Sequence, residues 1–142
     1  MTLIKKEEYI KILPENVEEE IEERVYGIAF LISKEDKKEI FKILDHREKD
    51  GYSRYTLDFY TNQDDQEPSI KNAITFVATT KNIRFCGYHH NSHISKIIHQ
   101  SKGPSGSNRE YLEKLYNSLQ IMGVKDNHIS SLYNHLILLD KN

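Results

Sequence analysis

Two stretches in the middle of this chain alternate between apolar and polar side chains, and this alternation constrains the fold more than any other feature. The stretches are residues 54–60 and residues 70–80. Their apolar positions are Tyr55, Leu57 and Phe59 in the first stretch and Ile74, Phe76 and Ala78 in the second. A period of two is the repeat of a β-strand with one wet face. Because a polar segment, residues 61–69, separates the stretches, we expect a hairpin.

The segment before the hairpin predicts a strand followed by a helix. Residues 25–32 form an almost continuous apolar run with β-branched and aromatic members, which is typical of a strand buried on both faces. Ser33 is a candidate N-cap, with Asp36 three residues later. The apolar face of the following helix consists of Ile40, Phe41, Ile43 and Leu44. Gly51 ends this helix or the turn just beyond it.

The last third of the chain is predicted to be helical. Apolar residues at helical spacing fall into three groups, which are Ile94, Ile97 and Ile98, then Tyr111, Leu112, Leu115 and Leu119, then Ile129, Leu132, Tyr133, Leu136 and Leu139. A glycine-rich turn, Gly103-Pro104-Ser105-Gly106, leads into the second helix, which Ser107 or Asn108 caps.

Length and charge limit the functional classes. With 142 residues, the chain is long enough for one domain with a core and too short to argue for two, so we expect a single domain over residues 1–142. A net charge of −2 gives no basic patch for nucleic acid or an anionic membrane, and we expect neither partner. The single cysteine, Cys86, and the absence of a signal-like or membrane-spanning apolar run indicate a soluble cytoplasmic protein.

Several polar residues are candidates for chemistry, each with a plainer alternative. Glu48 lies at the end of a predicted helix, where the helix dipole does not favour a carboxylate; the alternative is a surface glutamate paired with Arg47 or Lys49. Glu39 lies nine residues earlier, within half a helical turn of the same side, and is otherwise an ordinary exposed glutamate. The cluster of His89, His90 and His93 lacks the ligand spacing of a zinc site, so we expect surface histidines and no metal.

Three segments together resemble the ChaC-like γ-glutamylcyclotransferases. They are residues 25–30 (Val-Tyr-Gly-Ile-Ala-Phe), residues 44–52 (Leu-Asp-His-Arg-Glu-Lys-Asp-Gly-Tyr) and residues 103–112 (Gly-Pro-Ser-Gly-Ser-Asn-Arg-Glu-Tyr-Leu). The resemblance runs from Tyr26 to about Tyr133. It implies an α+β fold, a γ-glutamylcyclotransferase-like mixed β-sheet or partial barrel with surrounding helices.

The resemblance also implies an activity and a set of site residues. The activity is that of a carbon–nitrogen lyase, which converts glutathione or another γ-glutamyl peptide to 5-oxoproline and, from glutathione, Cys-Gly. In this family the glutamate of the Arg-Glu-Lys-x-Gly-Tyr segment is the acid–base residue, which here is Glu48. Tyr111, Glu39 and Tyr52 are the expected substrate-binding residues. No cofactor is expected, since the substrate carries its own nucleophile, an α-amine that attacks the γ-carbonyl.

One element of the family is absent from the sequence. Family members begin with a strand and a loop reading Tyr-Gly-Ser-Leu, and this tetrapeptide occurs nowhere in the chain. We therefore expect a sheet that lacks its first strand, with an exposed edge that favours self-association. The alternative function is that of a truncated, catalytically impaired homologue that serves as a binding or interaction domain.

Overall fold

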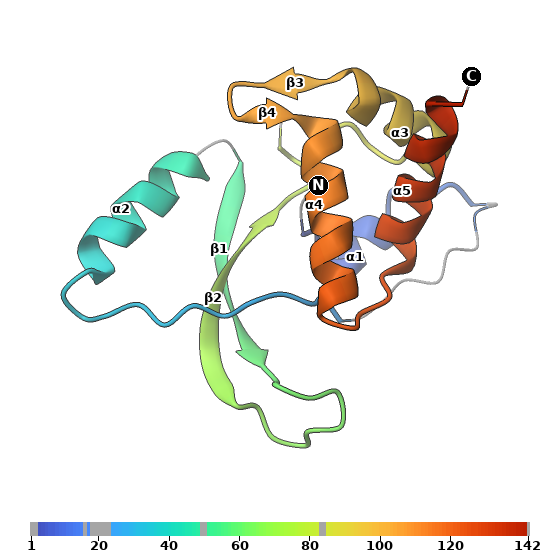
Figure 1. The fold of residues 1–142 in the computed structure, drawn as a ribbon. Coiled ribbons are helices and arrows are strands. Elements are labelled where there is room, and N and C mark those ends of the chain that lie inside the picture. The colour runs from blue at the N-terminus through green and yellow to red at the C-terminus, as the bar shows by residue number, and fades with distance from the viewer. Residues whose placement is uncertain (1–2, 16, 18–23, 49–50, 83–84, 142) are drawn as a thin grey trace. The chain divides into compact units, whose positions relative to one another are not determined.

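The computed structural model describes residues 3–15, 17, 24–48, 51–82 and 85–141. The chain divides into two compact units, Met1–Gly87 and Tyr88–Asn142, and each is described by itself. In the described residues, the first unit has two helices and an antiparallel pair of strands, and the second has three helices and a very short strand pair (Figure 1). None of the described helices has both the length and the apolar character needed to cross a membrane.

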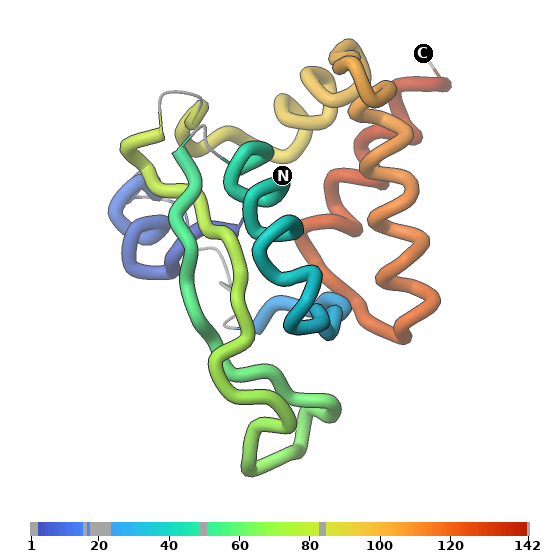
Figure 2. The backbone as a smooth tube through the Cα atoms, turned by 90° about the vertical axis from the view of Figure 1, so that its left-hand side faces the viewer, coloured from blue at the N-terminus to red at the C-terminus, as the bar shows by residue number. Residues whose placement is uncertain are grey.

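The predicted hairpin is confirmed and forms the centre of the first unit. Strands β1 (Tyr52–Phe59) and β2 (Ile70–Ala78) pair antiparallel, and Figure 2 shows them running side by side. In the loop between them, the Asp65 carboxylate accepts hydrogen bonds from the backbone N–H of Asn62 (2.9 Å) and the hydroxyl of Thr61 (3.1 Å). These bonds stabilise the ionised carboxylate, so they lower the pKa of Asp65.

The register of the hairpin places apolar side chains on both of its faces. The register pairs Arg54 with Phe76, Thr56 with Ile74, Tyr55 with Thr75, and Leu57 with Ala73. Because paired residues point to the same side of a sheet, Ile74 and Phe76 lie on one face, whereas Tyr55 lies on the other. Neither face of the hairpin is therefore wholly polar, and both need cover.

Each face of the hairpin has a neighbouring helix. On the face of Ile74 and Phe76, helix α2 (Lys37–Arg47) shares a shallow cavity of about 340 Å³ with β2. On the other face lies Lys5, the residue before helix α1 (Lys6–Ile10). Its ammonium is 4.2 Å from the centre of the Tyr55 ring. The Glu8 carboxylate of α1 accepts a hydrogen bond from the backbone N–H of Thr80 at 3.0 Å, which lowers the pKa of Glu8 and attaches α1 beyond the end of β2.

Helix α2 begins later than the sequence predicts. The Ser33 hydroxyl accepts a hydrogen bond from the backbone N–H of Asp36 (3.0 Å) and donates one to its carboxylate (2.8 Å). The predicted contact between these residues is therefore present, but it closes a turn, and the helix starts at Lys37. The predicted apolar face is half-buried at Ile40, Phe41 and Leu44, whereas Ile43 is exposed.

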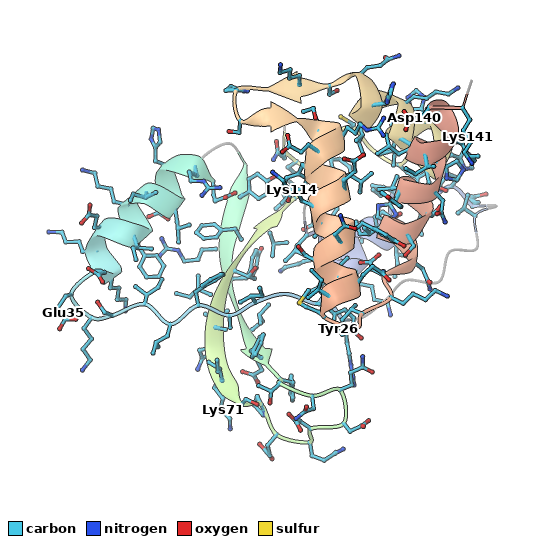
Figure 3. All side chains as sticks on the ribbon, viewed as in Figure 1. Tyr26, Glu35, Lys71, Lys114, Asp140 and Lys141 are labelled. Atoms are coloured by element: carbon cyan, nitrogen blue, oxygen red, sulfur yellow. The ribbon has the colours of Figure 1, made fainter. Side chains whose placement is uncertain are left out.

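The prediction of a buried strand over residues 25–32 is wrong. In the described part of the chain no strand pairs with this segment, and the side chains of Ile28, Phe30 and Leu31 are exposed, Leu31 completely. A strand buried on both faces requires neighbouring strands to satisfy its backbone groups. The segment is instead attached to the hairpin loop by polar contacts, since Gln63 donates to the Tyr26 hydroxyl at 3.1 Å (Tyr26 is labelled in Figure 3).

The second unit confirms the three predicted helices. They are α3 (Asn91–Gln100), α4 (Asn108–Ile121) and α5 (Asn127–Leu139). Their shared core consists of Ile98, Leu112, Leu119, Ile129, Leu132 and Leu136. The hydroxyl of buried Ser95 donates to the carbonyl oxygen of Asn91 (2.8 Å) or of Leu132 (3.0 Å), so it is satisfied where α3 meets α5.

Polar and aromatic contacts add to this core at the surface. The rings of Tyr116 and Tyr133 stack at 4.1 Å between α4 and α5. The guanidinium of Arg109, in the first turn of α4, binds both carboxylate oxygens of Asp140, which follows α5 (Figure 3), with 2.6 Å between Nη2 and Oδ2. It also donates to Glu113 at 2.9 Å. The Arg109 guanidinium lowers the pKa of Asp140.

A cavity in the second core should destabilise the fold strongly. Leu132 is fully buried, so Leu132→Ala removes apolar contacts that no neighbour can replace, and we expect a loss of roughly 2–5 kcal/mol in the free energy of unfolding. Urea titration followed by circular dichroism measures the loss. Ile121→Ala is the control, because Ile121 is 87% exposed and its truncation should change stability by less than about 0.5 kcal/mol. Equal effects would contradict the core assignment.

The Arg109–Asp140 pair should make stability depend on pH. Because the pKa of Asp140 is lower in the folded than in the unfolded chain, the stabilisation is present above the unfolded pKa of about 4 and is lost as the pH falls through the folded value. Asp140→Asn should therefore lower the melting temperature at pH 7 more than at about pH 3. The control is Asp64→Asn, an exposed aspartate in the hairpin loop. If the difference in melting temperature between Asp140→Asn and the wild type were larger at about pH 3 than at pH 7, the lowered pKa of Asp140 would be contradicted.

Gly51 marks the turn between α2 and β1. Its φ is +92°, and a Cβ at this position would lie 2.6 Å from the side chain of Asn82. Gly51→Ala should therefore destabilise by roughly 1–2 kcal/mol, the penalty of a left-handed conformation for a residue with a Cβ. Gly27→Ala is the matched control, since the φ of Gly27 is not positive and its added methyl group would meet no atom within 4 Å. Thermal melts of both variants measure the effect. A lower melting temperature for Gly51→Ala alone would confirm that the turn needs a left-handed residue at position 51.

Candidate active site

Glu48 is the residue that follows the last turn of α2. Its backbone N–H donates to the carbonyl oxygen of Leu44 at 2.9 Å, and its φ of −99° and ψ of 12° take it out of the helix. The side chain is half-buried. The helix C-terminus carries a partial negative charge, so it does not stabilise a carboxylate there. Placement at the end of α2, as predicted, therefore gives Glu48 no benefit from the helix dipole.

Tyr52 is the first residue of β1, on the far side of the turn that follows Glu48. It lies opposite Ala78, is half-buried, and shares a face of the hairpin with Arg54. Within the first unit, Glu48 and Tyr52 therefore flank the turn that ends at Gly51. Residues 49 and 50 of this turn lie outside the described residues.

Glu39 is not brought next to Glu48. It lies in the first turn of α2 and is exposed, whereas Glu48 follows the last turn. Nine residues of helix amount to two and a half turns and a rise of roughly 13 Å, which places the two side chains on opposite sides and at opposite ends. The expectation that they share a side is therefore wrong, and a role of Glu39 in binding substrate stays a prediction.

Tyr111 lies in the second unit, in the first turn of α4. The hydroxyl of Ser107 caps this helix by accepting the backbone N–H of Glu110 at 3.1 Å, which decides between the two predicted caps. The preceding turn is a two-residue hairpin between β3 (Lys102–Gly103) and β4 (Gly106–Ser107). Tyr111 is 57% exposed, so it lies outside the core of the unit, although its helical spacing groups it with Leu112, Leu115 and Leu119.

The structure shows an ion pair between Arg54 and Asp45 that sequence analysis did not predict. Arg54 of β1 forms an ion pair with Asp45 of α2, and its guanidinium lies 4.6 Å from the centre of the Phe41 ring. The sequence contains a hint of this ion pair. Arg54 occupies a polar position of the predicted strand, and Asp45 lies at the end of the helix before it. Only the register of the hairpin shows that this arginine faces α2.

The histidines and the cysteine do not form a metal centre in the described part of the chain. No three His, Cys, Asp or Glu side chains are grouped so as to hold a metal ion among the described residues. His89, His90 and His93 are exposed around the start of α3, with the rings of His89 and His93 4.9 Å apart. Cys86 is also exposed.

The chain matches a known family over nearly its whole length. Residues 1–137 match the family described as ChaC-like protein. Among curated relatives, gamma-glutamylcyclotransferase 2-3 of Arabidopsis thaliana is 35% identical over 119 residues, covering 81% of this chain and 60% of the relative. The glutathione-specific gamma-glutamylcyclotransferase of Schizosaccharomyces pombe is 30% identical over 113 residues, covering 78% of this chain and 56% of the relative. The chain thus spans less than two thirds of the length of each.

Solved structures of the same kind share the fold. The crystal structure of a glutathione-specific γ-glutamylcyclotransferase from yeast matches with a TM-score of 0.61 and 23% identity over 76% of this chain and 57% of the yeast chain. A selenomethionine-labelled structure of the yeast enzyme matches with a TM-score of 0.60 and 26% identity over 74% and 55% of the two chains. The predicted α+β, γ-glutamylcyclotransferase-like fold is confirmed, and the chain belongs to the ChaC-like protein family.

Proposed function

We propose that this protein is a glutathione-specific γ-glutamylcyclotransferase, which converts glutathione to 5-oxoproline and Cys-Gly. The observation that carries the proposal is its similarity to curated relatives with this activity in their names, at 30% identity for the Schizosaccharomyces pombe protein and 31% for the human one. Glu48 supports it as well, because its segment resembles the family's Arg-Glu-Lys-x-Gly-Tyr segment and its side chain is half-buried at the end of α2.

The reaction needs little from the protein besides positioning and proton transfer. The α-amine of the γ-glutamyl group attacks the γ-carbonyl carbon of the same molecule, so a new C–N bond closes the five-membered ring of 5-oxoproline. Holding the substrate in this folded shape can supply on the order of 7–11 kcal/mol. The bond from the same carbon to the cysteinyl nitrogen then breaks, and Cys-Gly leaves. No water is consumed, so the enzyme is a carbon–nitrogen lyase.

Glu48 carries the proton in this scheme. Its carboxylate takes a proton from the attacking amine and gives it to the departing cysteinyl nitrogen, acting first as general base and then as general acid. Tyr52, Glu39 and Tyr111 remain the proposed substrate-binding residues. Tyr52 is half-buried and Tyr111 is exposed, and the hydroxyl of a tyrosine can donate a hydrogen bond to a polar substrate or accept one from it.

The remaining proposals concern the whole protein. The family match runs through both compact units, which supports a single functional domain over residues 1–142. The balanced charge supports a small-molecule substrate rather than nucleic acid or a membrane, and we propose a cytoplasmic location. Self-association through an edge of the two-stranded β1–β2 sheet stays part of the proposal, since no third strand joins the sheet in the described residues and a single bridge, from Ile4 to Ala78, covers the outer side of β2 at its end.

The test is 5-oxoproline release from glutathione by the wild-type protein and by Glu48→Gln. Glutamine keeps the size of the side chain but cannot exchange the proton, so we expect kcat to fall by about 10²–10⁴-fold. Circular dichroism checks that both proteins are folded.

Glu67→Gln is the matched control. Glu67 is an exposed glutamate of the hairpin loop, and its carboxylate lies 4.0 Å from the ammonium of Lys71. Glu67→Gln should release 5-oxoproline at the wild-type rate. Full activity of Glu48→Gln would exclude Glu48 as the acid–base residue. A folded wild type without any release would contradict the proposed activity and favour a binding or interaction domain.

A further inference from the structure

We propose that Asp45 and Arg54 form a positioning pair that holds Glu48 in place for proton transfer. The catalytic part of this inference rests on the proposed function, because it assumes that Glu48 is the acid–base residue. Neither Asp45 nor Arg54 is assigned contact with the substrate. Their role is to join the end of α2 to the start of β1, on either side of the turn that Glu48 opens.

The guanidinium of Arg54 connects three elements of the first unit. It forms an ion pair with the carboxylate of Asp45 near the end of α2. It also lies 4.6 Å from the centre of the Phe41 ring of α2 and 5.9 Å from that of Phe76 on β2. A guanidinium over an aromatic face is attracted to the ring, and the ion pair fixes its orientation. Arg54 therefore links α2 to both strands.

Asp45 is well placed to transmit this link to Glu48. Asp45 lies in the last turn of α2, and Glu48 is the C-cap residue that follows this helix, three residues later. Glu48 is held to the last turn by the bond from its backbone N–H to the carbonyl oxygen of Leu44. Fixing Asp45 to β1 fixes that turn, and with it the direction in which the Glu48 side chain leaves.

Helix α2 has few other means of staying in place. It is 11 residues long, has no fully buried residue, and the aspartate before it makes no side-chain cap bond to the helix. A helix of this length is marginal by itself and depends on packing. A general base displaced by about 1 Å can lose on the order of 10²-fold in rate. An exposed ion pair contributes little to overall stability, so its loss should affect kcat more than folding.

The experiment compares Arg54→Met and Asp45→Asn with the wild-type protein. We expect kcat for 5-oxoproline release to fall by about 10–100-fold in each variant, with KM little changed. Arg54→Lys keeps the charge and should recover part of the loss. Because the two side chains act together, the double variant should be no slower than the slower single variant. Arg24→Met is the matched control, since Arg24 donates to the carbonyl oxygen of Gln63 in the hairpin loop at 2.9 Å.

A second measurement does not depend on activity. Hydrogen exchange followed by NMR reports how often the bond between the Glu48 amide and Leu44 opens, and we expect exchange about tenfold faster in Arg54→Met and unchanged in Arg24→Met.

The outcomes separate this proposal from the proposed function. Unchanged exchange at Glu48, unchanged kcat in both single variants, or a rise in KM alone would overturn the positioning pair. A rise in KM alone would instead make Arg54 a substrate-binding residue. Faster exchange in a protein that releases no 5-oxoproline would leave the pair as the support of the α2–β1 turn and overturn only the proposed reaction.

Discussion

The first unit depends on the register of one hairpin. Pairing Arg54 with Phe76 and Tyr55 with Thr75 puts apolar side chains on both faces of a two-stranded sheet, which is too small to be stable alone. One face is therefore next to α2 and the other next to the start of α1. Every proposed residue of the site in this unit is placed by that arrangement, because the turn carrying Glu48 connects the covering helix to the covered strand.

The two units are stabilised in different ways, and this bears on function. The second unit has a core of leucine and isoleucine, with a satisfied buried hydroxyl at Ser95. In the first unit, the buried residues among those described are Val77 and Ala78. The proposed acid–base residue thus lies in the less densely packed unit. Elements with little buried area open at low free energy, so the first unit should open locally more readily than the second.

Local periodicity predicted most of the secondary structure correctly. The hairpin and the three C-terminal helices follow from repeats of two and of about 3.6 residues, and the cap at Ser107 and the left-handed Gly51 follow from the chemistry of single residues. The failures, residues 25–32 and the expected burial of Ile28, concern contacts rather than propensity. An apolar run is buried only where other elements cover it, and no pattern within the run itself specifies that cover.

For the site, the sequence by itself determined the family and the candidate residues. The segment around Glu48 resembles the family's Arg-Glu-Lys-x-Gly-Tyr segment, and a helix followed by glycine places this carboxylate at a helix end. Only the tertiary structure decided which side chains meet. It exposed Tyr111 and brought Arg54 to Asp45 across a turn. The physical reason is that residue type and spacing act along the chain, whereas contact between a strand and a helix depends on register and packing, which involve the whole unit.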